Sequence, residues 1–280
     1  MTLSKLFVAS LILGCAPVAA HAAGKTPANP VALTTLDYSQ NFDGLAASGT
    51  GNSALPDGFQ VVETGSGSAA DGFYRAGSGS SNAGDVYSFG NSADRALGSL
   101  ASGSNDAIYF GAIFINRLDR IISDLRFAYT GEQWRAGSSN DDGLIFQLST
   151  DASELDNGTW RDVDALAFTP LVLSGNTALN GNVNSVDIFG TIAGLSIADG
   201  ASFGFRWFDS NSTGSDHGLA VDDLRITASL APVAGAVPEP STWLMLLLGF
   251  AMIGFTMRGA VRRSNKRFEA TLKKVAHVPA

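Results

Sequence analysis

Cysteine and histidine are almost missing from this 280-residue chain, and their scarcity limits its chemistry. Cys15 is the only cysteine, so the rest of the chain has no disulfide, no thiol nucleophile and no cysteine-ligated metal. His217 is the only histidine between residues 23 and 257, and the others are His21 and His277. One histidine cannot form a multi-histidine metal site. The chain also has no G-x-S-x-G elbow to supply a nucleophilic serine, which argues against a Ser-His-Asp hydrolase. We therefore interpret His217 as a turn residue.

Basic residues are also scarce over most of the chain. Between Ala23 and Met257 there are 25 acidic and 10 basic residues, a net charge of −15. A surface of this sign repels nucleic acid and anionic lipid, so we expect neither as a partner of this region. It fits cation binding as well as simple solubility.

Residues 24–228, which we call the body, contain no long stretch with the 3.6-residue apolar period of an amphipathic helix. Short β-branched and aromatic runs recur between clusters of Gly, Ser, Asn and Asp, and glycine and proline together make up 41 of the 280 residues. The pattern predicts an all-β fold, a two-sheet sandwich of jelly-roll type. A first strand is expected within 31–42, and further strands at 59–63, 85–89, 107–116, 121–130, 144–149, 165–169, 186–189, 201–208 and 219–227.

Two segments at the ends of the body carry a family resemblance. Asn41-Phe42-Asp43-Gly44-Leu45 near its start, and residues 216–226 near its end, loosely resemble concanavalin-A/laminin-G-like sandwiches. The resemblance implies that the first and last strands pair. Residues 65–84 are expected to form a long surface loop, and residues 229–236 a linker.

The first 22 residues have the parts of a secretory signal peptide. Lys5 is followed by an apolar segment at 6–16 and by the small-x-small site Ala20-His21-Ala22, which predicts cleavage after Ala22. The apolar part is too short to span a bilayer. A second interpretation is a lipoprotein box ending at Cys15, which the leucine before its glycine fits poorly.

The other end of the chain carries a second apolar run. Residues 243–257 hold no charge and are followed by Arg258, Arg262 and Arg263. We predict one transmembrane helix over 241–258 that stops at these arginines; the alternative is a buried core helix, since a span needs about 20 residues. The tail at 258–280 has seven Lys or Arg and one Glu, so the positive-inside rule places it in the cytoplasm and the body outside.

A short proline motif precedes this run. Val237, Pro238, Glu239 and Pro240 are followed by the apolar span and the arginine cluster, and this order resembles the PEP-CTERM protein-sorting signal. The prolines favour extended backbone and predict that 237–240 stay outside the helix, as they would in an ordinary linker. The chain departs from the pattern because it continues well past the arginines.

The resemblance has implications for location and partners. It implies a Gram-negative bacterium, an inner-membrane protein with its body on the periplasmic side, and processing near the motif by an exosortase. The body then reaches the cell surface or the exopolysaccharide matrix.

No cofactor is certain from the sequence, and calcium is the one candidate. The loop that begins at residue 209 starts like a D-x-N-x-x-G calcium loop, but Ala220 stands where the closing glutamate should be. The candidate ligands are Asp209, Asn211, Thr213, Asp216 and Asp222. An Asx- and Gly-rich hairpin loop explains the same residues without a metal.

Trp134 and Trp160 are candidates for stacking on sugar rings, although an aromatic residue in a strand also fits a core position. Glycosidases need two carboxylates, and no paired motif surrounds Glu132 or Glu154. We therefore interpret the protein as a non-enzymatic, surface-directed module that contacts glycan or matrix, or fills a structural role. The competing hypothesis is a secreted glycan-active hydrolase that uses Glu132 or Glu154.

Overall fold

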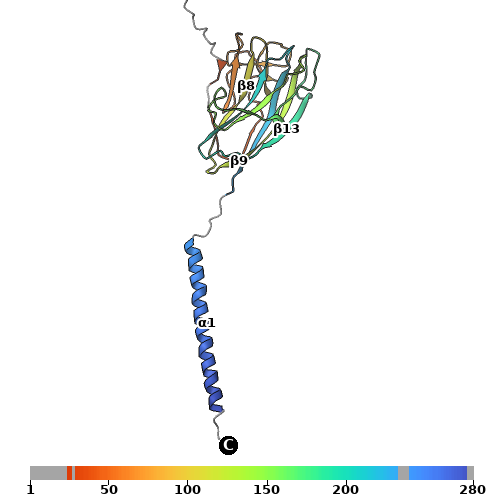
Figure 1. Ribbon diagram of the computed structural model, residues 1–280. Coiled ribbons are helices and arrows are strands. Elements are labelled where there is room, and N and C mark those ends of the chain that lie inside the picture. The colour runs from red at the N-terminus through yellow and green to blue at the C-terminus, as the bar shows by residue number, and fades with distance from the viewer. Residues whose placement is uncertain (1–23, 27–28, 233–239, 276–280) are drawn as a thin grey trace, which may run out of the picture. The chain divides into compact units, whose positions relative to one another are not determined.

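The computed structural model describes residues 24–26, 29–232 and 240–275 (Figure 1). The expected signal peptide and residues 237–239 of the sorting motif lie outside the described residues. The chain divides between Ala231 and Pro232 into two compact units, which are described separately.

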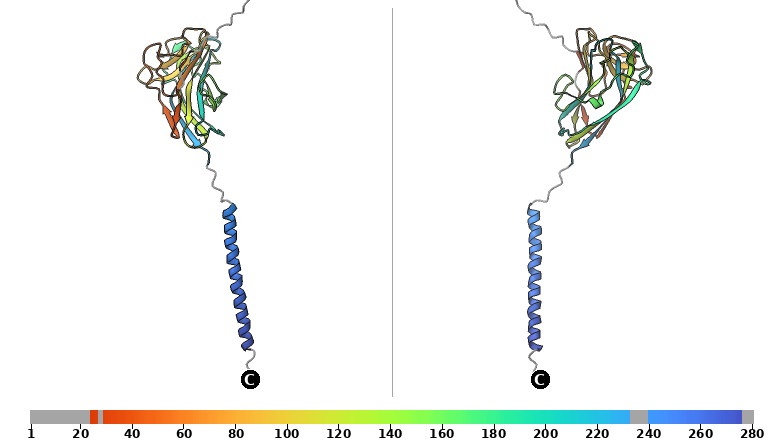
Figure 2. Two further views of the ribbon diagram at one scale, coloured as in Figure 1. Left: turned by 90° about the vertical axis from the view of Figure 1, so that its left-hand side faces the viewer. Right: turned by 45° about the vertical axis from the view of Figure 1, so that its right-hand side comes forward.

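The first unit is a sandwich of two sheets (Figures 1 and 2), which confirms the fold class expected from the sequence. In strand order, the seven-stranded sheet contains β1 (Gly24–Lys25), β4 (Phe59–Thr64), β8 (Ala107–Asn116), β14 (Ser202–Ser210), β10 (Ile145–Ser149) and β11 (Arg161–Asp162). The short strand β2 (Val31–Leu33) pairs in parallel with β8.

The second sheet has eight strands. In order, it contains β12 (Thr177–Ala178), β9 (Ile122–Ala136), β15 (Gly218–Leu230), β7 (Ala96–Leu100), β6 (Asp85–Phe89) and β5 (Tyr74–Gly77). The strand β13 (Ser185–Ile192) pairs with β9, and β3 (Asp37–Gln40) pairs with β15. The family resemblance implied that the first and last strands pair; the partner of the last strand is β3, which lies within the expected range 31–42, whereas β1 pairs with β4.

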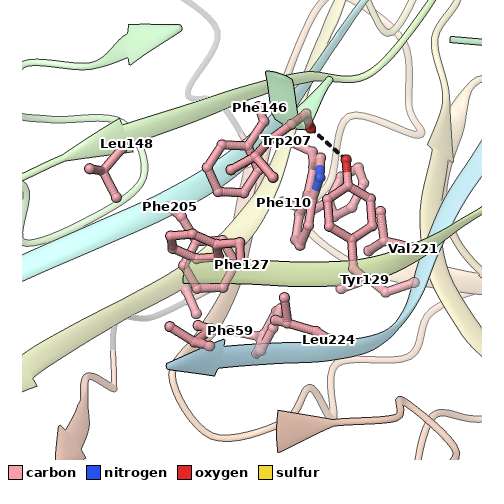
Figure 3. Close-up of a cluster of buried hydrophobic side chains, with 14 of the residues drawn as sticks. Phe59, Phe110, Phe127, Tyr129, Phe146, Leu148, Phe205, Trp207, Val221 and Leu224 are labelled. Carbon is pink, nitrogen blue, oxygen red and sulfur yellow. Dashed lines mark hydrogen bonds between the residues drawn. The ribbon is translucent and has the colours of Figure 1, made fainter. Parts of the chain in front are cut away.

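The core between the sheets is rich in aromatic rings (Figure 3). Side chains alternate between the faces of a strand, so Phe203, Phe205 and Trp207 of β14 all point inward and are fully buried. The ring of Phe205 lies within about 6 Å of five others, those of Phe59, Phe114, Phe127, Phe146 and Trp207. Burying one such side chain stabilises the fold by about 2 kcal/mol, so this core can replace the disulfides that the chain lacks.

Most expected strands are present, and the structure differs from expectation at four places. Residues 165–169 do not form a strand, because Asp164–Leu166 is a 3-10 turn that buries Leu166. The expected loop at 65–84 contains β5, and β7 was not foreseen. The strand expected at 121–130 begins at Ile122 and runs on to Ala136.

The second unit contains α1 (Pro240–Val275), one helix of 36 residues. It is long and apolar enough to cross a membrane by length and composition, over Ser241–Leu272. The helix begins at Pro240, whereas the sequence predicted that this proline stays outside. Proline is compatible with a first helical turn, where the missing N–H would have no partner. The helix also extends well beyond the span expected at 241–258.

Candidate functional site

A shallow groove crosses the outer face of the eight-stranded sheet, over β3, β15, β9 and β13. It consists of three adjoining hollows of about 410, 350 and 250 Å³, and Arg225 lines all three. We call this surface the groove. The residues that line the groove come from four strands that are far apart in the sequence. Only the pairing register of the sheet brings these residues together.

Strand pairing sets the floor of the groove. Phe127 and Tyr129 of β9 are buried in the core, so Ala128 between them faces outward. Ala128 pairs with Phe189 of β13 on one side and with Arg225 of β15 on the other. Directly paired residues share a face, so a small floor residue lies between an aromatic ring and a guanidinium group.

The aromatic ring is unusually open. Phe189 is 66% exposed, although it lies in the middle of a paired strand. Asp187 lies on the same face of β13, and its Oδ1 accepts a hydrogen bond of 3.3 Å from Thr130 Oγ1 across the strand pair. The groove therefore offers a flat apolar surface beside fixed polar groups.

Two arginines supply hydrogen-bond donors. Arg126 and Arg225 are exposed and line the same hollow. Within the described parts of the chain, the ion pairs involve Lys25 and Arg75, and neither groove arginine has an acidic partner within 4 Å. Both guanidinium groups are free to donate to a ligand.

A β-bulge adds a carboxylate at the edge of the floor. The register between β15 and β9 shifts between Asp222 and Arg225, and Asp223 has a left-handed φ of 49°. Adjacent strand residues normally point to opposite faces, which would turn Asp223 away from the face that Asp222 occupies. The bulge instead lets Asp223 line the groove while Leu224 is buried.

Beneath this edge, two further carboxyl groups are buried. Asp222 accepts a hydrogen bond of 2.7 Å from the backbone N–H of Asp223. Burial raises the pKa of Asp222 to about 8, with a further contribution from the nearby charge of Glu132. Burial also raises the pKa of Glu132, whose Oε2 accepts a 2.8 Å hydrogen bond from Trp134 Nε1.

The two tryptophans expected to stack on sugars have different environments, and neither lines the groove. Trp134 is 1% exposed, so its assignment as a stacking platform is wrong. Its ring stacks on Phe89 and is covered by Gly181, where a Cβ would meet the indole at 2.2 Å.

Trp160 is half-buried on the outer face of the seven-stranded sheet. The guanidinium of Arg206 lies 4.2 Å from its ring centroid and also 4.2 Å from that of Tyr109. One face of the Trp160 ring is therefore occupied by a cation–π contact within the protein. Its Nε1 donates to the Asn157 carbonyl at 2.7 Å.

The five candidate calcium ligands are not all brought together. Asp209 points between the sheets, where its Oδ2 accepts a 2.6 Å hydrogen bond from Ser99 Oγ, whereas Asp222 lies on the outer face of the eight-stranded sheet near Glu132. Asn211 and Thr213 are exposed. Among the residues that the structure describes, no three His, Cys, Asp or Glu side chains are placed to hold a metal ion.

Asp209 has two acidic neighbours instead. Burial raises the pKa of Asp209, and the charges of Asp142 and Asp216 raise it further. Asp209 Oδ1 and Asp142 Oδ1 are buried without a hydrogen-bond partner within the described residues. Burial also raises the pKa of Asp216 to about 7, with a contribution from Asp142.

His217 lies in the connection between β14 and β15 and is fully buried, so it is a structural residue. Its Nδ1 accepts a 2.9 Å hydrogen bond from the backbone N–H of Gly137 and lies 2.9 Å from Gln133 Nε2. Its Nε2 lies 2.9 Å from the Ser139 carbonyl, to which it donates. With both ring nitrogens engaged, His217 is not available as a general base.

The sequence did not single out the groove residues. The one visible signal was in β13, where Val186 and Ile188 alternate with Asp187 and Phe189. This alternation places a phenylalanine on the polar face of the strand. Arg126, Ala128 and Arg225 gave no such signal, because their proximity depends on the pairing of β9 with β15.

Comparison with known proteins confirms the sorting signal. The PEP-CTERM protein-sorting motif matches residues 236–263. Together with the apolar helix α1, it indicates anchoring in a membrane followed by export to the surface, with processing by an exosortase. No curated protein matches the chain.

Several solved structures are similar to the chain at low identity. The K1 cleaved adhesin domain of Lys-gingipain from Porphyromonas gingivalis W83 is 13% identical, with 69% of this chain and 98% of that one covered at a TM-score of 0.37. The CBM22-1 xylan-binding domain of Paenibacillus barcinonensis Xyn10C is 14% identical, with 70% and 95% covered at a TM-score of 0.31. TmCBM61 in complex with beta-1,4-galactotriose is 8% identical, with 51% and 75% covered at a TM-score of 0.28. At these TM-scores, none of the likenesses carries a conclusion about the ligand of this chain.

Proposed function

We propose that the sandwich is a glycan-binding module and that the groove holds a polysaccharide chain. The observation that carries the proposal is the pairing of Phe189 and Arg225 with the same floor residue, Ala128. A sugar ring has an apolar face and a rim of hydroxyl groups. It can pack on Phe189 while its hydroxyls bond to Arg126, Arg225 and the carboxylates of the groove.

The openness of the groove supports a polymer rather than a small metabolite. Its three hollows adjoin one another across four strands, and Arg225 lines each of them. Small-molecule sites are concave pockets that enclose most of their ligand. A shallow surface of this kind suits a chain that continues past the site at both ends.

The sorting signal supports a place of action in the cell envelope. We infer that α1 crosses the inner membrane of a Gram-negative bacterium with the sandwich on the periplasmic side, because the residues after the span are strongly basic. Processing at the motif by the exosortase then releases the sandwich to the surface or to the exopolysaccharide matrix.

The competing hypothesis is a glycan hydrolase. Glu132 is 4% exposed and hydrogen-bonded to Trp134, while Glu154 and Asp156 both contact Lys25, at 2.6 and 3.0 Å. A hydrolase needs an acid and a second carboxylate facing a substrate site. Neither glutamate lines the groove, which favours binding without turnover.

One experiment separates the two hypotheses. The purified sandwich is applied to a glycan array and to a hydrolysis screen with xylan, galactan and the extracellular polysaccharide of the host. We expect binding without release of reducing sugar. Hydrolysis that disappears in Glu132→Gln or Glu154→Gln would establish the hydrolase instead.

A further inference from the structure

The helix α1 is much longer than a membrane needs. At 1.5 Å per residue its 36 residues extend about 54 Å, whereas the hydrocarbon core of a bilayer is about 30 Å thick. The uncharged run at 243–257 fills most of that core. A span of about 20 residues that begins at Ser241 ends at Ala260, so the helical residues from Val261 onward lie outside the core.

This outer segment has two different faces. Val261, Phe268 and Leu272 are spaced by seven and four residues, which places them on one face of a helix. Their side chains are 59%, 67% and 52% exposed in the chain by itself. The other face carries four basic residues, which are Arg262, Arg263, Lys266 and Arg267.

We propose that residues 261–272 form an amphipathic helix that binds the surface of an anionic phospholipid bilayer. The inference rests on membrane insertion of α1 and is independent of the glycan ligand of the sandwich. The apolar stripe enters the boundary between headgroups and acyl chains, and the arginines and lysines contact lipid phosphates.

Charge and position both favour a lipid partner. The residues from Arg258 to the end of the chain include seven basic residues and one acidic residue, Glu269. The preceding span holds this segment next to the headgroups, so binding costs little additional freedom. Gly259 lies at the junction, and glycine is the residue that most weakens a helix apart from proline, which allows a bend toward the surface.

A second copy of the helix fits the same stripe less well. Val261, Asn265, Phe268 and Leu272 would lie along a coiled-coil seam, with a polar residue at one position. That seam covers about two heptads, and a coiled coil needs about three or four. The strong positive charge also repels a second copy, whereas it attracts an anionic bilayer.

The test uses the full chain in lipid nanodiscs. In a Cys15→Ser background, Asn265→Cys places one thiol on the apolar face, and Ala270→Cys places one on the opposite face. Each thiol carries a polarity-sensitive fluorophore. Discs of phosphatidylcholine are compared with discs that also contain phosphatidylglycerol, and an aqueous quencher reports exposure.

We expect the fluorophore at position 265 to be about fivefold less accessible to quencher than that at 270, in anionic discs only and less so at high salt. Phe268→Ser combined with Leu272→Ser should abolish the difference, whereas Thr271→Ser should leave it unchanged. Equal accessibility at the two positions in anionic discs overturns the proposal. Protection in both kinds of disc, together with a disulfide dimer formed by the unlabelled Asn265→Cys variant, also overturns it and identifies a helix pair.

Discussion

Phe189 and Arg225 lie on opposite sides of Ala128, and each is paired directly with it in the sheet. Neighbouring strands are about 4.8 Å apart, so the two side chains emerge about 10 Å from each other. The rigid sheet fixes this spacing, and ligand binding through these residues should need little rearrangement. The following predictions test that arrangement and the fold that supports it.

Removing the groove ring should weaken glycan binding without unfolding the protein. We expect Phe189→Ala to lower affinity for the bound polysaccharide about fivefold, which corresponds to about 1 kcal/mol for one aromatic contact. Leu173→Ala, at another exposed apolar residue outside the groove, should have no effect. Affinity electrophoresis in gels that contain the polysaccharide measures both variants.

Replacing a core phenylalanine by alanine should lower the stability of the fold, unlike the replacement of Phe189. Phe205→Ala removes a fully buried ring that contacts five others, and we expect it to lower the free energy of unfolding by about 3–5 kcal/mol. Phe189→Ala should change it by less than about 0.5 kcal/mol. Urea unfolding of the two variants gives the comparison. Equal losses of stability would show that Phe189 belongs to the core.

Stability should fall as the pH rises from about 4 to about 8. Burial raises the pKa of Asp216 and of Glu63 to about 7, and that of Asp222 to about 8. The folded state therefore binds more protons than the unfolded state over this range, so deprotonation favours unfolding. We expect a Tm at pH 8 about 5 °C or more below that at pH 5.

The variant Asp222→Asn can show how much of this pH dependence of the Tm comes from Asp222. Asp222→Asn should raise the Tm at pH 8 and change it little at pH 5, where the native carboxyl is already protonated. Asp119→Asn, at an exposed carboxylate, serves as the control. A Tm that rises between pH 5 and pH 8 would contradict the raised pKa values.

The same melts test the calcium hypothesis. The calcium hypothesis, with Asp209 and Asp216 among its ligands, requires that calcium raise the Tm and that Asp209→Asn remove the rise. The described residues place no three acidic side chains to hold a metal ion, so we expect no such rise. An unchanged Tm with calcium and with chelator would leave the segment as a hairpin loop without a metal.

Trp160 should matter for stability rather than for glycan binding. Its ring packs on the Arg206 guanidinium, which Tyr109 also contacts. We expect Trp160→Ala to lower the free energy of unfolding by about 1–2 kcal/mol and to leave polysaccharide affinity unchanged. A large loss of affinity with unchanged stability would move the binding surface to the seven-stranded sheet.

The local residue pattern predicted a strand correctly where that pattern alone determines the structure of the segment. Residues 107–116 are apolar on both faces, and they form a central strand with those bounds. Segment 165–169 looked like a strand, yet Leu166 is buried by a 3-10 turn beneath Gly190. Strand β7 was missed because Ala96-Leu97-Gly98-Ser99-Leu100 has no β-branched or aromatic residue, and its pairing partners hold it in the sheet.

The candidate site could not be predicted in the same way. Its residues meet only through the register of four strands, and the bulge at Asp223 changes the side to which one carboxylate points. Trp134 and Trp160 each stand next to arginine in the sequence, yet one is enclosed and the other half-buried. The sorting signal, in contrast, is a linear motif and was evident from residue order.

The most direct test of the glycan-binding proposal is an NMR titration of the isotope-labelled sandwich with oligosaccharides from the host polysaccharide. The account predicts that the largest amide shifts occur at Ala128, Phe189 and Arg225 and at their neighbours in β9, β13 and β15. Shifts that cluster around Trp160 and Tyr109, or no shifts at saturating oligosaccharide, would contradict it.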